Sequence, residues 1–428
     1  MATVNEIPVL PYGVGRITRG WLGAAALLVV LLVVGVFAYS RQFIHGEEVT
    51  GLFDVGTRGG APWGLYVVFV VYFVGVSTGL MLIGIIAELL KIGHMRSITR
   101  IAEGLAIISL ILGALSVIVD LGQPLRGIIG FFQYARPMSP FFGTFTLVVS
   151  GALFASVIYL FLTLRPDAAI LAKRKSGLAT FYKWWASGYK DTPAERARRE
   201  RSSIWLAFGI LPLRILAYST LGFVFGLQVG RPGWQSALQA PGFIILAVVS
   251  GAALLILVAA AARRIPGARD DLSIPTFSWL SNVMTILLMV YLYFLLAELL
   301  TSGYTSTQVG WRVTSSLLTG QFAVLNWISI GMLVLATGMG GWQMVRRNYS
   351  LSMMVAAGGL VTISAILQRY LIVVPSLTTG ALLPYEEGSY TPTLIEYGVV
   401  LGLVALGTLM FLAFLKVVPI LAIQKESD

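Results

Sequence analysis

The chain has 428 residues, of which 57% are hydrophobic and only 11% are charged. Soluble domains carry about 25% charged residues, so this composition excludes an ordinary soluble protein. The sequence has no cysteine, which excludes disulfides, thiolate metal sites and iron–sulfur clusters held by the chain itself. The net charge of +11 does not indicate nucleic-acid binding, because the basic residues concentrate in one loop and at the ends of apolar runs.

Ten apolar segments are long enough to cross a bilayer, which takes about 20 residues. They predict an all-α, polytopic protein with a single integral membrane domain over 1–428. The predicted spans are 18–40, 61–90, 98–119, 140–164, 203–229, 238–262, 273–300, 322–345, 350–375 and 394–422. The run after Trp21 is longer than a signal-peptide core and lacks a small-residue cleavage pattern, so we expect it to be the first span.

The order of the spans predicts two four-helix bundles with flanking helices. The first bundle covers 61–229 and contains a basic cytoplasmic loop at 165–201, and the second covers 238–375. The first span, 18–40, and the last, 394–422, flank them. This division is an expectation from geometry, since no clear residue-level repeat accompanies it.

Lysine and arginine predict the orientation. If both termini are cytoplasmic, the inner segments hold 22 of these residues and the outer segments hold 6. This imbalance is typical of a multi-pass protein of the inner (cytoplasmic) membrane. The 165–201 loop contains KRK, a Trp-Trp pair and ERARRER. It is either a docking or lipid-binding segment or a topological anchor on the anionic leaflet, and the second interpretation is favoured.

Charged side chains inside or at the ends of spans are candidates for function, because burying a charge in the bilayer is costly. Six of them share the outer depth: Asp120, Arg126, Arg136, Glu298, Arg369 and Glu396. They form either a structural ion network that pins the helix ends or a polar headgroup site with apolar walls, and the set favours the site. Aromatic residues at this depth are Trp63, Tyr66, Phe131, Phe132 and Tyr134, most of which an interfacial aromatic belt explains.

The segment VIVDLGQPLRG places Asp120 at the end of a span, and Pro124 prevents the helix from continuing regularly. We expect this break to turn Arg126 back over the site. Asp120 is then either a residue of the site or one half of an ion pair at a helix end.

A second polar group is predicted deeper in the membrane. Arg214 lies near the middle of its span, and Glu88 and Glu103 lie toward the inner side. These three residues outline a proton path from the inner face toward the outer site. A plain buried ion pair is the alternative.

The histidines exclude a membrane haem of the b type, which needs two facing histidines at one depth. The chain has only His45 and His94, and they are predicted on opposite sides of the membrane. The sequence also contains no nucleotide-binding glycine fingerprint.

Several segments, in order, resemble one family of membrane subunits. They are VTGLFDVGTRGGAPWGLYVVFVVYFVGVSTG, DLGQPLR with ARPMSPFFGTF, GRPGWQSALQAPGFIILAVVSGAA, LLAELLTSGY, and LQRYLIVV with YTPTLIEYG. Together they resemble the polysulfide reductase membrane subunits of the NrfD/PsrC type over about residues 45–420. The ten-span form looks most like the subunits of alternative complex III and of the sulfite-reductase-associated and Hme-type complexes.

The resemblance implies a quinone-reactive anchor subunit of a respiratory oxidoreductase complex. Such subunits bind a quinol, often menaquinol, near the outer face, carry no haem or iron–sulfur cluster, and exchange electrons with a ferredoxin-like iron–sulfur subunit docked outside. A molybdopterin or cytochrome c subunit is a further expected partner, and some members are proposed to move protons. The residues expected at the quinone are Trp63, Tyr66, Asp120, Gln123, Arg126, Arg136, Glu298, Arg369 and Glu396.

Asp120 is the expected catalytic residue, acting as general base for the quinol proton. Members of the complex III type often have a histidine where this chain has Asp120, and another in the helix that holds Tyr218. A carboxylate would therefore have to replace the histidine here. Nearby arginines would keep it ionised and hydrogen-bond the quinone oxygens.

Two other functions compete with this interpretation. A secondary transporter or proton-conducting membrane protein would concentrate polar groups at the midplane and could use Arg214 and Pro212. A purely structural anchor would not need so many charges at one depth. The predominance of outer charges favours the quinone interpretation.

The topology can be tested with a reporter protein fused within 165–201. We expect a cytoplasmic signal, because this loop carries the highest density of positive charge. The same reporter fused between the third and fourth spans is the matched control and should report the outer side. A periplasmic signal from the basic loop would overturn the whole assignment of depth.

Overall fold

The computed structural model describes residues 14–15, 17–52, 61–134, 146–173, 178–231, 233–265, 268–305, 307–379 and 388–419. Its regular elements in these ranges are helices, and ten of them are long and apolar enough to cross a membrane. The predicted all-α, ten-span architecture is therefore confirmed.

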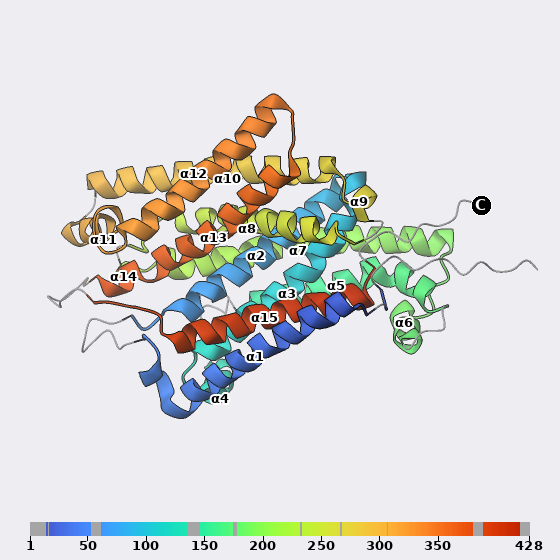
Figure 1. The fold of residues 1–428 in the computed structure, drawn as a ribbon, viewed down its shortest axis with the longest axis horizontal. Coiled ribbons are helices and arrows are strands. Elements are labelled where there is room, and N and C mark those ends of the chain that lie inside the picture. The colour runs from blue at the N-terminus through green and yellow to red at the C-terminus, as the bar shows by residue number, and fades with distance from the viewer. Residues whose placement is uncertain are drawn as a thin grey trace, which may run out of the picture.

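The long helices run through the molecule side by side (Figure 1). Their bounds are α1 Arg19–His45, α2 Leu65–Leu89, α3 Arg96–Asp120, α5 Thr146–Leu171, α7 Pro193–Gly226, α8 Gln239–Ala262, α10 Ile274–Thr305, α12 Ala323–Arg346, α13 Leu351–Val373 and α15 Leu394–Val417. Shorter elements join them: η1 Gly46–Val49, η2 Gly93–Met95, α4 Pro124–Tyr134, α6 Ala179–Ala186, α9 Ala268–Asp271, α11 Gln308–Leu318 and α14 Pro375–Thr378.

Helix α7 begins ten residues earlier than the predicted span. Thr192 caps it by accepting a hydrogen bond from the Glu195 amide, and Pro193 occupies the first turn, where its missing N–H costs nothing. The basic 165–201 segment is therefore not one continuous loop, because residues 165–171 belong to α5, α6 covers Ala179–Ala186, and residues 193–201 belong to α7. This extension carries the run of charges away from the apolar part of α7.

Helix α2 lies at the centre of the molecule, and most of its residues are buried. It has no charged residue before Glu88 and is hydrophobic on every face, which is the pattern of a buried helix. It contacts α3, α7, α8 and α13. Small residues permit the close approach to α8, where Gly79 lies against the backbone of Ala247 and Gly251 lies against Gly79.

Eight of the long helices form two groups, which meet along α2 and α8. Helices α2, α3, α5 and α7 contact one another, and so do α8, α10, α12 and α13. Because α2 also contacts α8 and α13, the groups share a broad interface. The exact domain boundaries, 61–229 and 238–375, stay a prediction.

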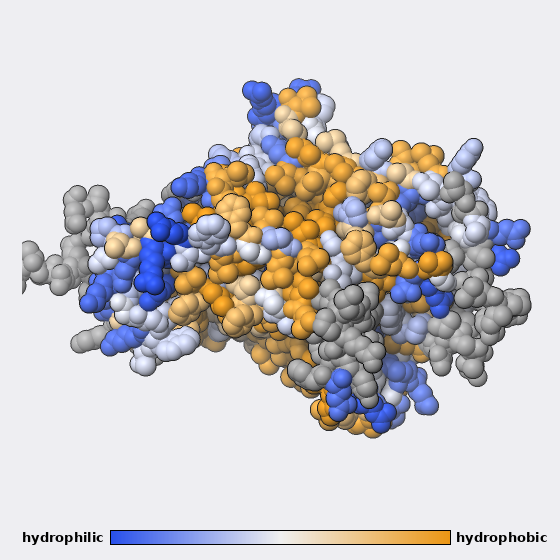
Figure 2. Space-filling model, turned by 180° about the vertical axis from the view of Figure 1, so that it is seen from behind, coloured by the Kyte–Doolittle hydropathy of each residue, from blue (hydrophilic) through white to orange (hydrophobic). Residues whose placement is uncertain are grey.

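Helices α1 and α15 form a pair along one side of the molecule (Figure 1). Gly35 and Gly402 meet backbone to backbone, and Gly398 faces Ala38. The other face of α1 is apolar and exposed, as at Phe37, which is 66% exposed. Figure 2 shows hydrophobic side chains over the middle of one face of the molecule and hydrophilic ones gathered toward its ends, as expected for a surface in contact with lipid.

The α1–α15 contact can be tested by cross-linking, because the chain has no native cysteine. A Cβ atom at Gly398 would lie 3.0 Å from the Cβ atom of Ala38, so we expect Ala38→Cys with Gly398→Cys to form a disulfide. The control pair is Phe37→Cys with Gly398→Cys, because Phe37 points away from α15. The measurement is whether the two halves stay joined after protease cleavage within 165–201. Equal cross-linking of both pairs would contradict this packing.

Candidate functional site

Three carboxylates meet at one end of the molecule, which we call the Asp120 end. Asp120 is the last residue of α3, Glu47 lies in η1, and Glu396 lies in the first turn of α15. Glu47 and Glu396 are both close enough to act electrostatically on Asp120. These three residues form the acidic cluster. Its members come from the start, the first third and the end of the chain.

Glu396 is completely buried and is fully engaged in hydrogen bonds. Its Oε1 accepts from the Tyr390 hydroxyl at 2.5 Å, and its Oε2 accepts from the amides of Gly51 and Thr393 at 2.8 and 2.9 Å. The bond from Thr393 belongs to a capping box at the start of α15. The carboxylate of Glu396 therefore holds three segments together instead of standing open to a ligand.

Tyr390 also depends on this arrangement. Its hydroxyl accepts a hydrogen bond from the Leu65 amide at 2.7 Å, which fixes the start of α2. Burial, and then the charge of Glu396, raise the pKa of Tyr390, so the hydroxyl stays protonated and donates to Glu396.

Tyr66 and Gln42 connect α2 and α1 to the acidic cluster. The Tyr66 hydroxyl donates to Gln42 Oε1 at 2.8 Å. The Gln42 amide donates in turn to Glu47 Oε1 at 3.1 Å and to the Val119 carbonyl at 3.3 Å, next to Asp120. Both side chains are buried. They therefore fix the position of Glu47 relative to the end of α3.

Asp120 differs from its neighbours because one oxygen, Oδ1, is enclosed and has no hydrogen-bond partner among the residues that the structure describes. A buried acceptor without a donor costs about 1–3 kcal/mol. A hydroxyl group brought next to this oxygen would remove that cost. Of the three carboxylates, Asp120 is the one suited to receive a ligand.

Arg126 does not turn back over Asp120. Pro124 starts a new helix, α4, and both Gln123 and Arg126 are exposed at its beginning. Within the described ranges, the ion pairs do not include Arg126 or Asp120, so the alternative of a helix-end ion pair is not seen there either. Arg136 and the side chains of Phe131, Phe132 and Tyr134 lie outside the described part of the chain.

Trp63 contributes an aromatic wall next to the start of α2. Its ring stacks on Trp234, with centroids 5.6 Å apart and planes 16° apart, and meets Phe225 edge-on. The indole of Trp234 donates to the Ile372 carbonyl at 2.6 Å, which ties this wall to α13. The contacts with Trp234 and Phe225 hold the Trp63 ring in place. Trp63 precedes Leu65 by two residues, and the Leu65 amide donates a hydrogen bond to Tyr390.

Two of the predicted site residues lie elsewhere. Arg369 is buried among α7, α8 and α13, with its guanidinium 4.2 Å from the ring centre of Phe243 and 5.7 Å from that of Tyr218. Glu298 lines a separate pocket beside α11 and α12. The structure therefore unites Asp120, Glu396 and Tyr66, but it does not bring Arg369 and Glu298 to them.

A second group of acids lies toward the opposite end, which we call the Glu88 end. Glu88 accepts hydrogen bonds from the Tyr159 hydroxyl and from Ser203, the latter at 3.3 Å. Glu103 accepts one from Thr163 at 3.1 Å and lies close enough to Glu88 for their charges to interact. The two predicted carboxylates therefore share one polar group formed by α2, α3, α5 and α7.

Arg214 lies in the middle of the helices and is bonded to hydroxyl groups. Its Nη1 donates to Ser77 at 2.8 Å and its Nη2 donates to Ser156 at 2.7 Å. In the described ranges it forms no ion pair, so the alternative of a plain buried ion pair is not observed there. Ser156 precedes Tyr159 by about one turn of α5, so polar side chains follow one another along α5 from Arg214 toward Glu88.

Sequence reasoning missed Glu47, Gln42, Tyr390, Tyr159 and Ser156. Glu47 had a usable signal, since GEEV directly follows the first span on the same side as Asp120. Tyr159 lies within an apolar span, as several other hydroxyl residues of this chain do, so the sequence did not distinguish it. Gln42 and Tyr390 had no comparable signal, because their role depends on which helices are neighbours.

Comparison with known proteins identifies the family. Residues 54–381 match the family described as "Polysulphide reductase, NrfD". The chain belongs to the NrfD family. This result confirms the resemblance inferred from the sequence motifs, and it makes the chain an integral, multi-pass membrane protein of that family.

Three relatives align with the NrfD-family chain over nearly their whole length. A putative dimethyl sulfoxide reductase membrane subunit from Halobacterium salinarum is 32% identical over 98% of this chain and 95% of its own. A selenate reductase subunit from Mesobacillus selenatarsenatis is 25% identical over 94% of each chain. The Hdr-like menaquinol oxidoreductase integral membrane subunit of Archaeoglobus fulgidus is 24% identical over 91% of this chain and 92% of its own.

The Glu396 network can be tested with Tyr390→Phe. The change leaves the Leu65 amide without an acceptor and Glu396 Oε1 without a donor, each at a cost of about 1–3 kcal/mol. We expect less folded protein to survive heating in detergent, measured by size-exclusion chromatography. Tyr397→Phe, an exposed position in α15, is the control and should behave as the wild type. Equal survival of both variants would contradict the role of this network.

Proposed function

We propose that this chain is the quinol-oxidising membrane anchor subunit of a multi-subunit respiratory reductase. The observation that carries the proposal is the enclosed, unpartnered oxygen of Asp120 at the end of a membrane span. It offers an acceptor to a hydroxyl group at the depth where the headgroup of a membrane quinol lies. Membership of the NrfD family and the names of the three relatives support the same function.

The chemistry needs a base beside the quinol hydroxyl. Oxidation of one quinol releases two electrons and two protons, and Asp120 would accept a proton as the electrons leave. Glu47 is the next carboxylate and is half-buried, so it offers a route for that proton to water. Tyr66, Gln42 and Glu396 would act as positioning residues, because their hydrogen bonds hold the cluster in place.

The substrate and partners follow from this role. Menaquinol is the proposed quinol, since one relative is a menaquinol oxidoreductase subunit. With no cysteine and only two histidines, the chain must pass its electrons to another subunit. We assign that role to a ferredoxin-like iron–sulfur subunit docked at the Asp120 end, followed by a molybdopterin subunit or a cytochrome c subunit.

The orientation is part of the proposal. The Asp120 end would face outward and both termini would be cytoplasmic in the inner (cytoplasmic) membrane, because positive charge concentrates at the Glu88 end. The bond from the Gly15 amide to the Lys416 carbonyl joins the two ends of the described chain there, in keeping with this assignment.

Proton translocation is a second candidate function of the same chain. The polar row of Glu88, Tyr159, Ser156 and Arg214 favours it, since these groups are joined by hydrogen bonds or lie one helical turn apart. Glu103 would exchange protons with Glu88 at the inner side. A secondary transporter is less well supported, because Arg214 at the midplane is already held by two serines.

The base can be tested with Asp120→Asn in the assembled complex. Asparagine keeps the shape and can still accept a hydrogen bond, but it cannot take up the proton. We expect quinol-dependent electron transfer per complex to fall by about 10²–10⁴-fold while the yield of complex is nearly unchanged.

Glu48→Gln is the matched control, because Glu48 is an exposed carboxylate in the same short helix as Glu47. Its turnover should equal that of the wild type. Normal turnover of Asp120→Asn in well-assembled complex would remove the proton-acceptor role. A loss of complex without a loss of turnover per complex would make Asp120 structural.

A further inference from the structure

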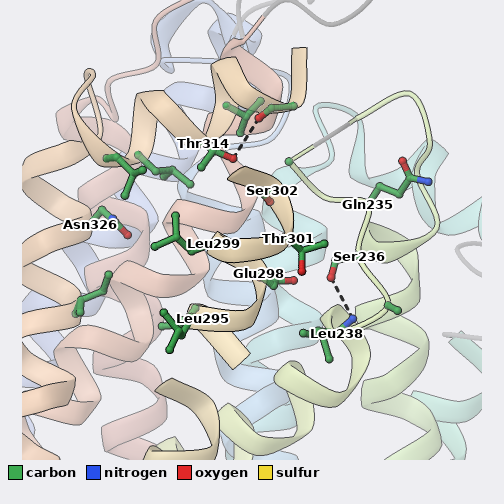
Figure 3. Close-up of a pocket in the computed structure, with 18 of the residues that line it drawn as sticks. Gln235, Ser236, Leu238, Leu295, Glu298, Leu299, Thr301, Ser302, Thr314 and Asn326 are labelled. Atoms are coloured by element: carbon green, nitrogen blue, oxygen red, sulfur yellow. Dashed lines mark hydrogen bonds between the residues drawn. The ribbon is translucent and has the colours of Figure 1, made fainter. Parts of the chain in front are cut away.

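A separate pocket opens near the Asp120 end between the last turns of α10, the helices α11 and α12, and the segment 233–238 (Figure 3). Its volume is about 830 Å³, which lies within the usual range for small-molecule sites. The pocket has an apolar and a polar part. The apolar part contains Leu292, Leu295, Leu296, Leu299, Leu317 and Ile330.

The polar part is centred on Glu298. In Figure 3 the side chains of Glu298, Thr301 and Ser236 lie close together beside the pocket. Ser236 interacts with the Glu298 carboxylate, and its hydroxyl oxygen accepts a hydrogen bond from the Leu238 amide at 3.1 Å. Asn326, from α12, adds an amide to the pocket lining. A ligand headgroup in this space would meet a carboxylate, hydroxyl groups and an amide.

This pocket is not a part of the acidic cluster. Figure 1 shows α10, α11 and α12 on the opposite side of the molecule from α1, α4 and α15. Helix α10 contacts α8, α12 and α13, whereas α3, which ends in Asp120, packs mainly against α2 and α15, and α8 contacts both α3 and α10. The interior helices therefore separate Glu298 from Asp120.

The walls of the pocket indicate how a ligand would reach it. Leu296 and Trp327 both line the pocket, yet they are 51% and 53% exposed on the flank of the molecule. That flank belongs to two membrane-spanning helices, so the exposed surface faces lipid. A ligand would enter sideways from the bilayer and would leave an apolar tail between these helices.

The charge of the lining selects the headgroup. Among the residues that the structure describes, the lining includes Glu298 but no lysine or arginine. An anionic phosphate would be repelled by the carboxylate and would find no cation in this lining, so a phospholipid headgroup fits poorly. A neutral headgroup that donates hydrogen bonds from hydroxyl groups fits Glu298 and Asn326. A hydroquinone with an isoprenoid tail has both properties.

We propose that this pocket is a second quinol-binding site, distinct from the one at Asp120. This proposal rests on the proposed function, because both sites would bind a quinol. Glu298 would accept a hydrogen bond from one quinol hydroxyl, and the leucines of α10 would contact the ring and the first part of the tail. The site binds quinol, and no electron transfer is assigned to it.

The test is photolabelling of the intact complex in membranes with an azido-naphthoquinone that carries an isoprenoid tail and is reduced before illumination. We expect labelled peptides from two regions, one around Asp120 and one within 292–330. Leu299→Trp fills the pocket and should lower labelling of 292–330 by about tenfold or more, without affecting the Asp120 region. Glu298→Leu removes the acceptor and should have the same selective effect.

Leu300→Trp is the control, because Leu300 is the next residue of α10, is 64% exposed and does not line the pocket. It should leave both regions labelled. Label around Asp120 but not within 292–330 would overturn the second site and leave the proposed function standing. Label in neither region would count against the proposed function itself. Native mass spectrometry that finds a phospholipid retained by wild type and lost from Leu299→Trp would also overturn the second site.

Discussion

The carboxylate of Glu396 is the interaction on which the Asp120 end depends. Fully buried in a protein surrounded by lipid, it must find its donors within the chain. It finds them in Tyr390, Gly51 and Thr393, and so joins the segment after α1, the segment before α15 and, through Tyr390, the start of α2. The α1–α15 pair and the central α2 are thereby fixed to one another. Asp120 lies beside this network, and its Oδ1 has no hydrogen-bond partner among the described residues.

The fold was largely predictable, because the signals for membrane spans are local. Run length and the absence of charge identified ten spans, and the structure has ten helices that fit them. The start of α7 was missed, since Thr192, Pro193 and Glu195 form a helix start within a charged segment that hydropathy does not recognise. Local capping chemistry, rather than apolar content, decides where that helix begins.

The site was only partly predictable, because the sequence indicates how deep a residue lies in the membrane but not its lateral position among the helices. Asp120, Glu298 and Arg369 were grouped on shared depth, but they lie on different sides of the helices and have different neighbours. Depth did identify Asp120 and Glu396 as members of one cluster. It could not identify Gln42 or Tyr390, whose importance comes from the packing of α1 and α15 against α2. Lateral position is set by helix packing, and a single sequence contains little information on it.

The two buried arginines, Arg214 and Arg369, bear on whether protons can cross the protein. Arg214 is bonded to two serines and Arg369 lies against aromatic rings, and in the described ranges neither pairs with a carboxylate. Near the Glu88 end, by contrast, Arg100 pairs with Asp167 at 2.5 Å. Positive charge without a carboxylate partner in the interior raises the barrier to the passage of cations between the two acidic regions. Under the proposed function, protons released at Asp120 would therefore leave on the near side through Glu47. Proton translocation across the membrane would have to pass Arg214, whereas quinol oxidation at Asp120 would not. Arg214 is therefore the residue that distinguishes the two candidate functions.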